Sequence, residues 1–396
     1  MSDVAHLRFP EFSGEWEKCS IQDYGEVVTG NTPPTSHAEY YENGSYLWAS
    51  PADLGINKNI TETKTKLSLS GFKKTRSIPK GSVLVTCIGS TIGKMGMAAE
   101  TMSSNQQINS IVVNDKSNSD FVYYAICRAF PRYLSEVAVQ AVPILSKSNF
   151  EKLPNYTTCR DEQDKIGYFL NLLDERIATQ NKIIEKLESL IKGLNDSLYE
   201  RYGNGIRTSF DKLGYSYSGL SGKSAGDFGK GKPFIPYLNV YSNNVVNESD
   251  YQYVQIDEGE KQNVVQYGDV LFTLSSETPE EVGIGSVYLG QDEVYLNSFC
   301  FGIHIVNEEL AYPPYISYYV SSTPFRKFIY PFAQGSTRFN LCKADFEKTS
   351  ITLPSLDNQK RIFSVLNSIT MNISIEKAML EQYVTQKQHL LRQMFI

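Results

Sequence analysis

The chain repeats one segment at a distance of about half its length. Leu145–Lys152 reads Leu-Ser-Lys-Ser-Asn-Phe-Glu-Lys, and Leu341–Lys348, 196 residues later, reads Leu-Cys-Lys-Ala-Asp-Phe-Glu-Lys. The same offset continues without a gap for roughly thirty residues and aligns Gln163 with Gln359. A period this long indicates two copies of one unit rather than a solenoid of short repeats.

Length and composition are those of a folded protein of the reducing cytoplasm. The chain has 396 residues, enough for two or three domains with their own cores, and 12% aromatic residues, typical of sheet-containing domains. Residues 1–14 lack the apolar run of a signal peptide, and no stretch is apolar for long enough to span a bilayer. The six cysteines are scattered, and the four histidines lie far apart, so we expect free thiols, no metal and no cofactor.

Two stretches of heptad-spaced apolar residues predict long helices. The first covers residues 159–200 and ends at the Gly-Asn-Gly of residues 203–205, and the second covers residues 355–396. Each has a polar residue at one position of its apolar seam, Gln180 in the first and Glu376 in the second. These two residues either form a polar layer that fixes the register of the helices or lie solvated at the edge of the seam.

The order globule, helix, globule, helix determines the expected architecture. The first helix ends where the second globule begins, and the second helix begins where that globule ends, so the helices should run antiparallel. The predicted fold is α+β, with two α/β globules separated by an antiparallel two-helix coiled coil with pseudo-two-fold symmetry. The predicted regions are a first globule at 1–152, a central helical region at 153–203, a second globule at 204–348 and a distal helical region at 349–396.

The two globules share a scaffold motif but differ elsewhere. Gly81–Thr86 reads Gly-Ser-Val-Leu-Val-Thr, and Gly268–Thr273 reads Gly-Asp-Val-Leu-Phe-Thr. A common scaffold with divergent loops predicts two domains that recognise different things.

Eight short segments carry a resemblance to a known family. They are Leu7–Pro10, Tyr46–Leu54, Ile78–Gly89, Asp161–Ile166, Tyr217–Lys223, Tyr237–Val240, Ala333–Arg338 and Leu353–Ile362. As an ordered set, they make the chain similar to the specificity subunits of type I restriction-modification systems over essentially its full length.

That resemblance implies a non-catalytic, DNA-binding protein. Its globules would be target recognition domains, each of which reads one half of a split site in double-stranded DNA. Two modification (methyltransferase) subunits would assemble around the chain, and restriction subunits would join them. No membrane is expected to take part.

In the first globule, the predicted DNA contacts lie in a stretch whose charged residues are all positive. From Thr63 to Ala99 there are seven cations and no acid, although the whole chain carries a net charge of −6. Such a cluster can neutralise phosphates, while serine and threonine add neutral donors; the alternative is a solvated basic face. The candidate residues are Lys73, Lys74, Arg76, Lys80, Ser90, Thr91 and Lys94.

The second globule has the opposite charge pattern. No lysine or arginine occurs from Gln262 to Phe325, a stretch that contains several acids. Phosphate contacts would therefore have to come from Lys223, Lys230, Lys232, Arg326, Lys327 or Arg338. The polar side chains of Asn239, Tyr241 and Asn243 are candidates for contacts with base edges, since asparagine pairs well with adenine.

Two other classes of function are alternatives to DNA recognition. A stand-alone DNA methyltransferase needs an Asn/Asp-Pro-Pro-aromatic motif, but Tyr312 occupies its first position here, and Gly283–Gly285 is too short for a cofactor loop. A structural coiled-coil adaptor would explain the helices but not two divergent globules on one scaffold.

Overall fold

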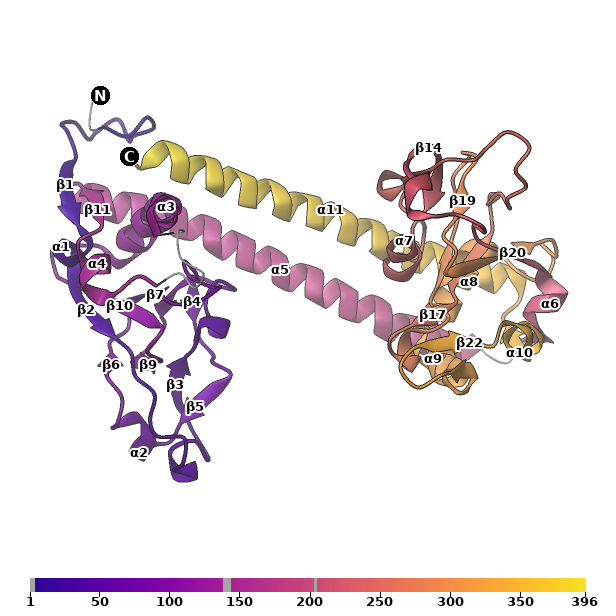
Figure 1. Cartoon of the computed structure of the whole chain (residues 1–396), viewed down its shortest axis with the longest axis horizontal. Coiled ribbons are helices and arrows are strands. Elements are labelled where there is room, and N and C mark those ends of the chain that lie inside the picture. The colour runs from indigo at the N-terminus through magenta and orange to yellow at the C-terminus, as the bar shows by residue number, and fades with distance from the viewer. Residues whose placement is uncertain (1–3, 138–143, 203–204) are drawn as a thin grey trace. The chain divides into compact units, whose positions relative to one another are not determined.

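The computed structural model describes residues 4–137, 144–202 and 205–396 and divides the chain into two compact units. Unit 1 combines Met1–Ile183 with Lys377–Ile396, and unit 2 is Ile184–Glu376. The long helices are α5 (Arg160–Tyr202) and α11 (Leu356–Met394), and each unit contains part of both (Figure 1). The predicted end of the first helix at residues 203–204 lies outside the described residues.

Within each unit, the start of one long helix packs beside the end of the other. In unit 1, Ile166 near the start of α5 shares a core with Leu390 near the end of α11. In unit 2, Ile362 near the start of α11 belongs to the core against which Leu198 of α5 packs. The helices are therefore antiparallel, and the predicted fold class is confirmed. At the polar seam positions, Gln180 is buried and Glu376 is half-buried.

The globule of unit 1 is built on mixed β-sheets. One sheet has the strand order β2-β10-β7-β8-β4, and another has the order β5-β3-β9-β6. The first sheet contains β2 (Gly25–Thr29), β10 (Ile108–Val113), β7 (Val83–Thr86), β8 (Met95–Ala98) and β4 (Asn59–Ile60). The second contains β5 (Thr65–Leu67), β3 (Tyr46–Ala49), β9 (Met102–Ser104) and β6 (Ser77–Ile78).

The globule of unit 2 has the same arrangement with different sequences. The order β13-β20-β16-β18 corresponds to β2-β10-β7-β8, and β14 runs parallel to β19 as β3 does to β9. The main sheet contains β13 (Gly214–Ser218), β20 (Cys300–Ile305), β16 (Val270–Thr273) and β18 (Gly285–Val287). The smaller sheets contain β14 (Phe228–Ile235), β15 (Gln252–Val254) and β19 (Tyr295–Leu296), and β17 (Ser275–Ser276), β21 (Ala333–Gln334) and β22 (Phe339–Leu341).

Equivalent glycines begin the first strand of each main sheet. Gly25 opens β2 and Gly214 opens β13, and each lies against the neighbouring strand. A Cβ atom at Gly25 would collide with the carbonyl oxygen of Val112, and one at Gly214 would collide with that of His304. The close approach of two backbones therefore requires glycine at both positions.

Short helices and edge strands complete both units. In unit 1, α3 packs on β7 and β8, and in unit 2, α8 packs on β16 and β18. The shorter helices are α1 (Ile21–Tyr24), α2 (Leu69–Phe72), α3 (Ser119–Val137), α4 (Lys147–Glu151), α6 (Phe210–Leu213), α7 (Tyr237–Ser242), α8 (Pro313–Ser321), α9 (Thr323–Ile329) and α10 (Lys343–Lys348). The ends of each globule pair as β1 (Glu17–Ser20) with β11 (Pro154–Thr157), and β12 (Ile206–Thr208) with β23 (Ile351–Leu353). Among the described residues, no helix has both the length and the apolar character needed to cross a membrane.

A buried glutamine joins each globule to a long helix. Gln163 of α5 accepts a hydrogen bond from the backbone N–H of Asn118 (2.9 Å), the residue before α3. Gln359 of α11 accepts one from the backbone N–H of Tyr312 (2.8 Å), the residue before α8. Each side-chain amide also donates to a carbonyl just ahead of its own helix. The two glutamines are 2% and 0% exposed, so these bonds form away from water.

A tyrosine makes a second equivalent connection. The hydroxyl of Tyr124 on α3 donates to the carboxylate of Asp174 on α5 (2.5 Å). In unit 2, the hydroxyls of Tyr318 on α8 and Thr370 on α11 are joined at 2.8 Å. The position of the contact is repeated although the acceptor residue is not.

We predict that Gln163→Leu lowers the free energy of unfolding by about 1–3 kcal/mol, because the buried N–H of Asn118 loses its acceptor. Urea denaturation measures the change. Gln382→Leu, at an exposed position of α11, is the matched control and should change stability by less than about 0.5 kcal/mol. Equal stability of the two variants would contradict the role given to Gln163.

Candidate nucleic-acid interface

In unit 1, the side chain of Asn31 holds the turn that carries most of the candidate cations. Its amide nitrogen donates to the carbonyl of Lys74 (2.9 Å), and its oxygen accepts from the backbone N–H of Arg76 (2.8 Å). The Arg76 guanidinium donates to the carbonyl of Thr29 (2.8 Å). Lys73 and Lys74 are exposed, and neither ammonium group has a bonded partner among the described residues. The turn therefore presents two unpaired cations from a fixed backbone.

The remaining candidates of unit 1 lie at the two ends of β7. Lys80 precedes this strand, while Ser90, Thr91 and Lys94 belong to the loop between β7 and β8. The segment 104–107 connects that loop with the cationic turn. Its Ser104 carbonyl accepts from the backbone N–H of Asn31 (2.8 Å), and Gln107 donates to the carbonyl of Ile88 (3.4 Å). The structure thus places the turn and the β7–β8 loop on two sides of one segment.

Two uncharged residues between these groups were missed by sequence analysis. Thr32 follows β2 and donates its hydroxyl to the side-chain oxygen of Gln106, which precedes β10, at 2.5 Å. Both side chains are exposed and carry donors and acceptors of the kind that read base edges. The candidates in this globule were identified chiefly by a cluster of positive charge, and neither Thr32 nor Gln106 is charged. Only the pairing of β2 with β10 brings them together.

In unit 2, the two candidate asparagines stabilise a turn, Asn239 as a buried residue and Asn243 as a half-buried one. Asn239 is 3% exposed, accepts from the backbone N–H of Asn247 (3.0 Å) and donates to its carbonyl (2.8 Å). Asn243 donates to the carbonyl of Asn239 (3.0 Å). These contacts give both amides a structural role, and we leave them out of the interface.

The candidate lysines of unit 2 differ in their availability. Lys223 donates to the carboxylate of Glu260 (2.5 Å), and its side chain is 8% exposed. This hydrogen bond, together with those from the Gln262 side chain and the Asp257 backbone N–H, lowers the pKa of Glu260 to about 2, so the carboxylate stays ionised at neutral pH. Lys232 lies 3.4 Å from the carboxylate of Glu293 on the surface, and Lys230 is exposed on β14. Lys230 and Lys232 therefore remain candidates, whereas Lys223 is committed to its partner.

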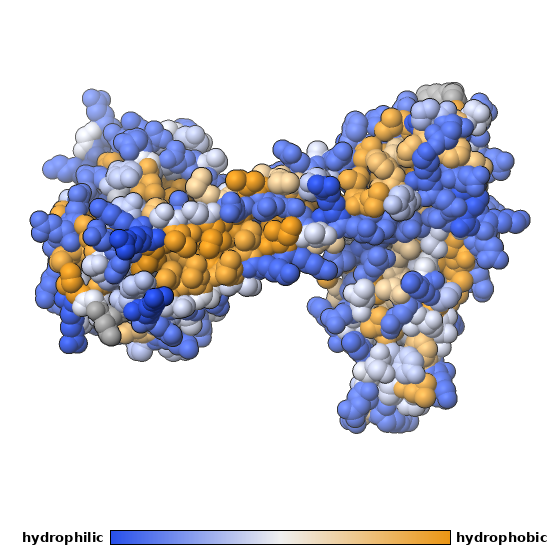
Figure 2. All heavy atoms as spheres, turned by 180° about the vertical axis from the view of Figure 1, so that it is seen from behind, coloured by the Kyte–Doolittle hydropathy of each residue, from blue (hydrophilic) through white to orange (hydrophobic). Residues whose placement is uncertain are grey.

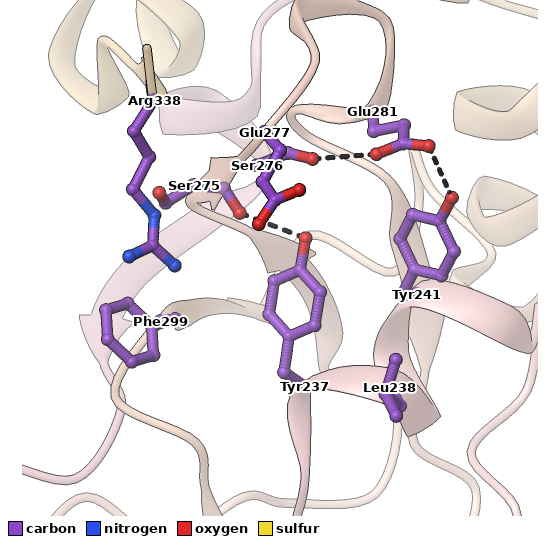
Figure 3. Close-up of a pocket in the computed structure, with 9 residues that line it drawn as sticks. All are labelled: Tyr237, Leu238, Tyr241, Ser275, Ser276, Glu277, Glu281, Phe299 and Arg338. Carbon is purple, nitrogen blue, oxygen red and sulfur yellow. Dashed lines mark hydrogen bonds between the residues drawn. The ribbon is translucent and has the colours of Figure 1, made fainter. Parts of the chain in front are cut away.

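The two other candidates of unit 2, Tyr241 and Arg338, meet at a pocket of about 290 Å³ (Figure 3). Its walls come from α7, from β17 and the segment after it, from the residue before β20 and from the residue before β22. The lining residues are Tyr237, Leu238, Tyr241, Ser275, Ser276, Glu277, Glu281, Phe299 and Arg338.

Hydrogen bonds inside the pocket occupy one of its acids. The Tyr241 hydroxyl and the Ser276 hydroxyl each donate to a different oxygen of Glu281, both at 2.8 Å. The bond from Tyr241 lowers the pKa of Glu281 and raises that of Tyr241, which keeps the carboxylate ionised. The Arg338 guanidinium lies 5.1 Å from the centre of the Phe299 ring. Within the described ranges it has no ion pair or hydrogen bond, so it is available to a ligand.

Comparisons with known proteins agree on one family. The family model described as "Type I restriction modification DNA specificity domain" matches residues 13–189 and 227–385. The specificity subunit of the type I restriction enzyme HindI of Haemophilus influenzae is 28% identical over 186 residues, which cover 44% of this chain and 40% of that protein. The specificity subunit of MjaIX of Methanocaldococcus jannaschii is 30% identical over 188 residues, covering 44% and 42%. Each match thus spans about two fifths of the relative's length.

The fold has a counterpart among solved structures. A type I restriction-modification S subunit from M. genitalium aligns with a TM-score of 0.62 and 15% identity, over 99% of both chains. At this identity, the likeness concerns the fold alone.

We predict that Lys223→Met raises the pKa of Glu260 from about 2 toward its ordinary value of 4.5. Because the folded state favours the charged carboxylate, this pair stabilises the protein above pH 4.5, and its contribution is lost as the pH falls toward 2. Titration of the Glu260 carboxyl carbon by NMR measures the change, and Lys230→Met serves as the control. A midpoint that stays near 2 in Lys223→Met would assign the shift to other donors.

Proposed function

The chain belongs to the type I restriction-modification DNA specificity family, and on this premise we propose that it is the DNA-recognition subunit of such a complex. It reads an asymmetric, bipartite target in double-stranded DNA, one half-site with each globule. It carries no catalytic site and directs methylation and restriction by partner subunits, in the cytoplasm where the DNA lies.

One observation carries this proposal: the two globules have the same strand order and opposite surface chemistry. Equivalent strands of the two main sheets are β2-β10-β7-β8 and β13-β20-β16-β18. The first globule presents unpaired cations, whereas the second presents a pocket with two acids and one free arginine. Duplicated scaffolds with different surfaces suit a target whose two halves differ in sequence.

In the first globule, we assign phosphate contacts to Lys73, Lys74 and Arg76 on one side and to Lys94 on the other. Phosphate contacts fix the position of a protein on the duplex but carry little sequence information. The exposed pair of Thr32 and Gln106 lies between these cations and is therefore our candidate for contacts with base edges. Ser90 and Thr91 supply neutral donors beside Lys94.

In the second globule, we assign phosphate contacts to Lys230 and Lys232 and a place at the DNA to the pocket of Tyr241 and Arg338. The surface around this pocket is acidic, so fewer phosphate contacts are available than in the first globule. The second half-site is therefore expected to depend more on contacts with bases and less on charge.

The long helices offer a surface for the modification subunits. Several large apolar side chains of α5 and α11 in unit 2 are exposed, and Figure 2 shows an apolar surface along these helices. They are Leu190, Val365, Met371 and Ile375. Met371 and Ile375 lie four residues apart, on one face of α11. Exposed apolar stripes of this kind mark protein interfaces, and we propose that two modification subunits, joined by restriction subunits, assemble there.

The competing functions lack support in the site. Pro313 and Pro314 form the first turn of α8, and the backbone N–H of Tyr312 is bonded to Gln359. This segment is therefore a helix start joined to α11, and Tyr312 stands where a methyltransferase motif needs Asn or Asp. A purely structural adaptor leaves the unpaired cations of the first globule without a purpose.

We predict that replacing residues 1–152 with the equivalent globule of a relative changes only one half of the recognised site. The second half should be unchanged, because it depends on the second globule. Sequencing of methylated sites in a host that carries the complex reads out both halves at once. Simultaneous change of both half-sites, or a continuous target, would refute the model of two independent readers.

We predict that the double substitution Lys73→Ala and Lys74→Ala weakens DNA binding on every sequence, because phosphate contacts are lost. The slope of log affinity against log salt should decrease by about 0.9 for each contact removed. Lys116→Ala, an exposed cation of the same unit outside the turn, is the control. Unchanged DNA affinity together with loss of methyltransferase assembly would make the turn a protein interface.

A further inference from the structure

We propose that Arg338 reads a guanine in the half-site recognised by the second globule, with the rim of the pocket as the base-contacting surface. The inference rests on the proposed function and deepens it, since it names the base and the residue. Guanine offers two adjacent acceptors, N7 and O6, in the major groove, and the fork of an arginine matches them.

The Arg338 side chain stacks on an aromatic ring and keeps its N–H donors free. It is exposed, and its guanidinium lies over the Phe299 ring with a separation of 5.1 Å from the ring centre (Figure 3). Stacking on an aromatic ring restricts the planar fork without using its N–H donors. Restricting a side chain before binding lowers the entropy cost of the complex. Arg338 is thus oriented while its donors remain free.

The wall of the pocket contains a buried hydroxyl without a hydrogen-bond partner among the described residues. Ser275 is 4% exposed, and its hydroxyl is buried without a hydrogen-bond partner among the described residues. Buried polar groups in proteins are nearly always bonded, so an orphan in a pocket wall points to a missing partner. Glu281 does not provide it, because its two oxygens already accept from Tyr241 and Ser276.

The pocket lies at a position of the scaffold that is repeated in the two units. In unit 1, the backbone N–H of Gln107 donates to the side chain of Asn105 (3.0 Å); in unit 2, that of Phe299 donates to Asn297 (2.9 Å). Phe299 therefore occupies the position of Gln107, in the segment that lies between the cationic turn and the β7–β8 loop. The pocket and the proposed interface of the first globule occupy the same place on the shared scaffold.

The charges around the pocket favour a guanine over a phosphate as the partner of Arg338. Glu277 is exposed at the pocket, and no lysine or arginine occurs between Gln262 and Phe325. A phosphate bound by Arg338 would meet this acidic surface, whereas a guanine edge is neutral. The carboxylate of Glu277 is also a suitable acceptor for the N4 amino group of cytosine, the partner of guanine. The charges around Arg338 therefore favour a G·C base pair over the DNA backbone.

The test measures binding of the full chain, in complex with its modification subunits, to DNA duplexes. These duplexes carry the target sequence that the sequencing of methylated sites identifies. Each guanine of the second half-site is replaced singly by 7-deazaguanine, which lacks the N7 acceptor. One replacement should weaken binding of the unmodified protein by about tenfold. Arg338→Ala should bind the natural site more weakly by a similar factor and lose its sensitivity to that replacement, the signature of a direct coupling.

Two controls guard the interpretation. Lys327→Ala, an exposed cation on α9, should keep the sensitivity to 7-deazaguanine, and Arg338→Gln tests the same coupling in a more conservative variant. The inference would be overturned if no 7-deazaguanine replacement weakened binding of the unmodified protein. It would also be overturned if Arg338→Ala weakened binding equally on all duplexes and lowered the slope of log affinity against log salt, which would make Arg338 a phosphate contact. A complex that binds no bipartite target would overturn the proposed function itself and this inference with it.

Discussion

A buried hydrogen bond that a glutamine side chain accepts helps to fix the arrangement of each globule on its helix. Gln163 and Gln359 each bind the backbone N–H that precedes the main helix of their globule, and both are almost completely buried. An apolar contact would tolerate sliding, whereas a buried donor without its acceptor costs about 1–3 kcal/mol. The bond therefore selects one orientation of α3 on α5 and of α8 on α11, and every surface loop inherits its position from that orientation.

Sequence patterns predicted the parts of the fold that depend on local periodicity. The heptads of α5 and α11 and the strand motifs at Gly81 and Gly268 are short-range signals, so the helices and the repeat could be inferred directly. The connection from Tyr124 to Asp174 could not, because its counterpart joins Tyr318 to a threonine. The residues Asp174 and Thr370 differ, so a comparison of the two sequences does not reveal the contact, although the structure repeats it.

The candidate site was harder to predict because composition does not determine exposure. Asn239 and Tyr241 are two residues apart and both polar, yet the first is locked in a turn and the second lines a pocket. Thr32 and Gln106 are 74 residues apart and meet only through strand pairing. The charge pattern pointed to Lys73 and Lys74, and both are exposed, as lysines without a partner usually are. Their contact with DNA stays a prediction.

In each globule the first and last strands lie side by side. In the first globule β1 pairs with β11, and in the second β12 pairs with β23. Because the two ends of a globule are neighbours, the length and shape of the chain between them do not alter the paired strands that join the globule to the helices. A globule is in this sense an exchangeable cassette. Under the proposed function, genetic recombination at the two flanks would deliver a new DNA specificity in one event and leave the helices unchanged.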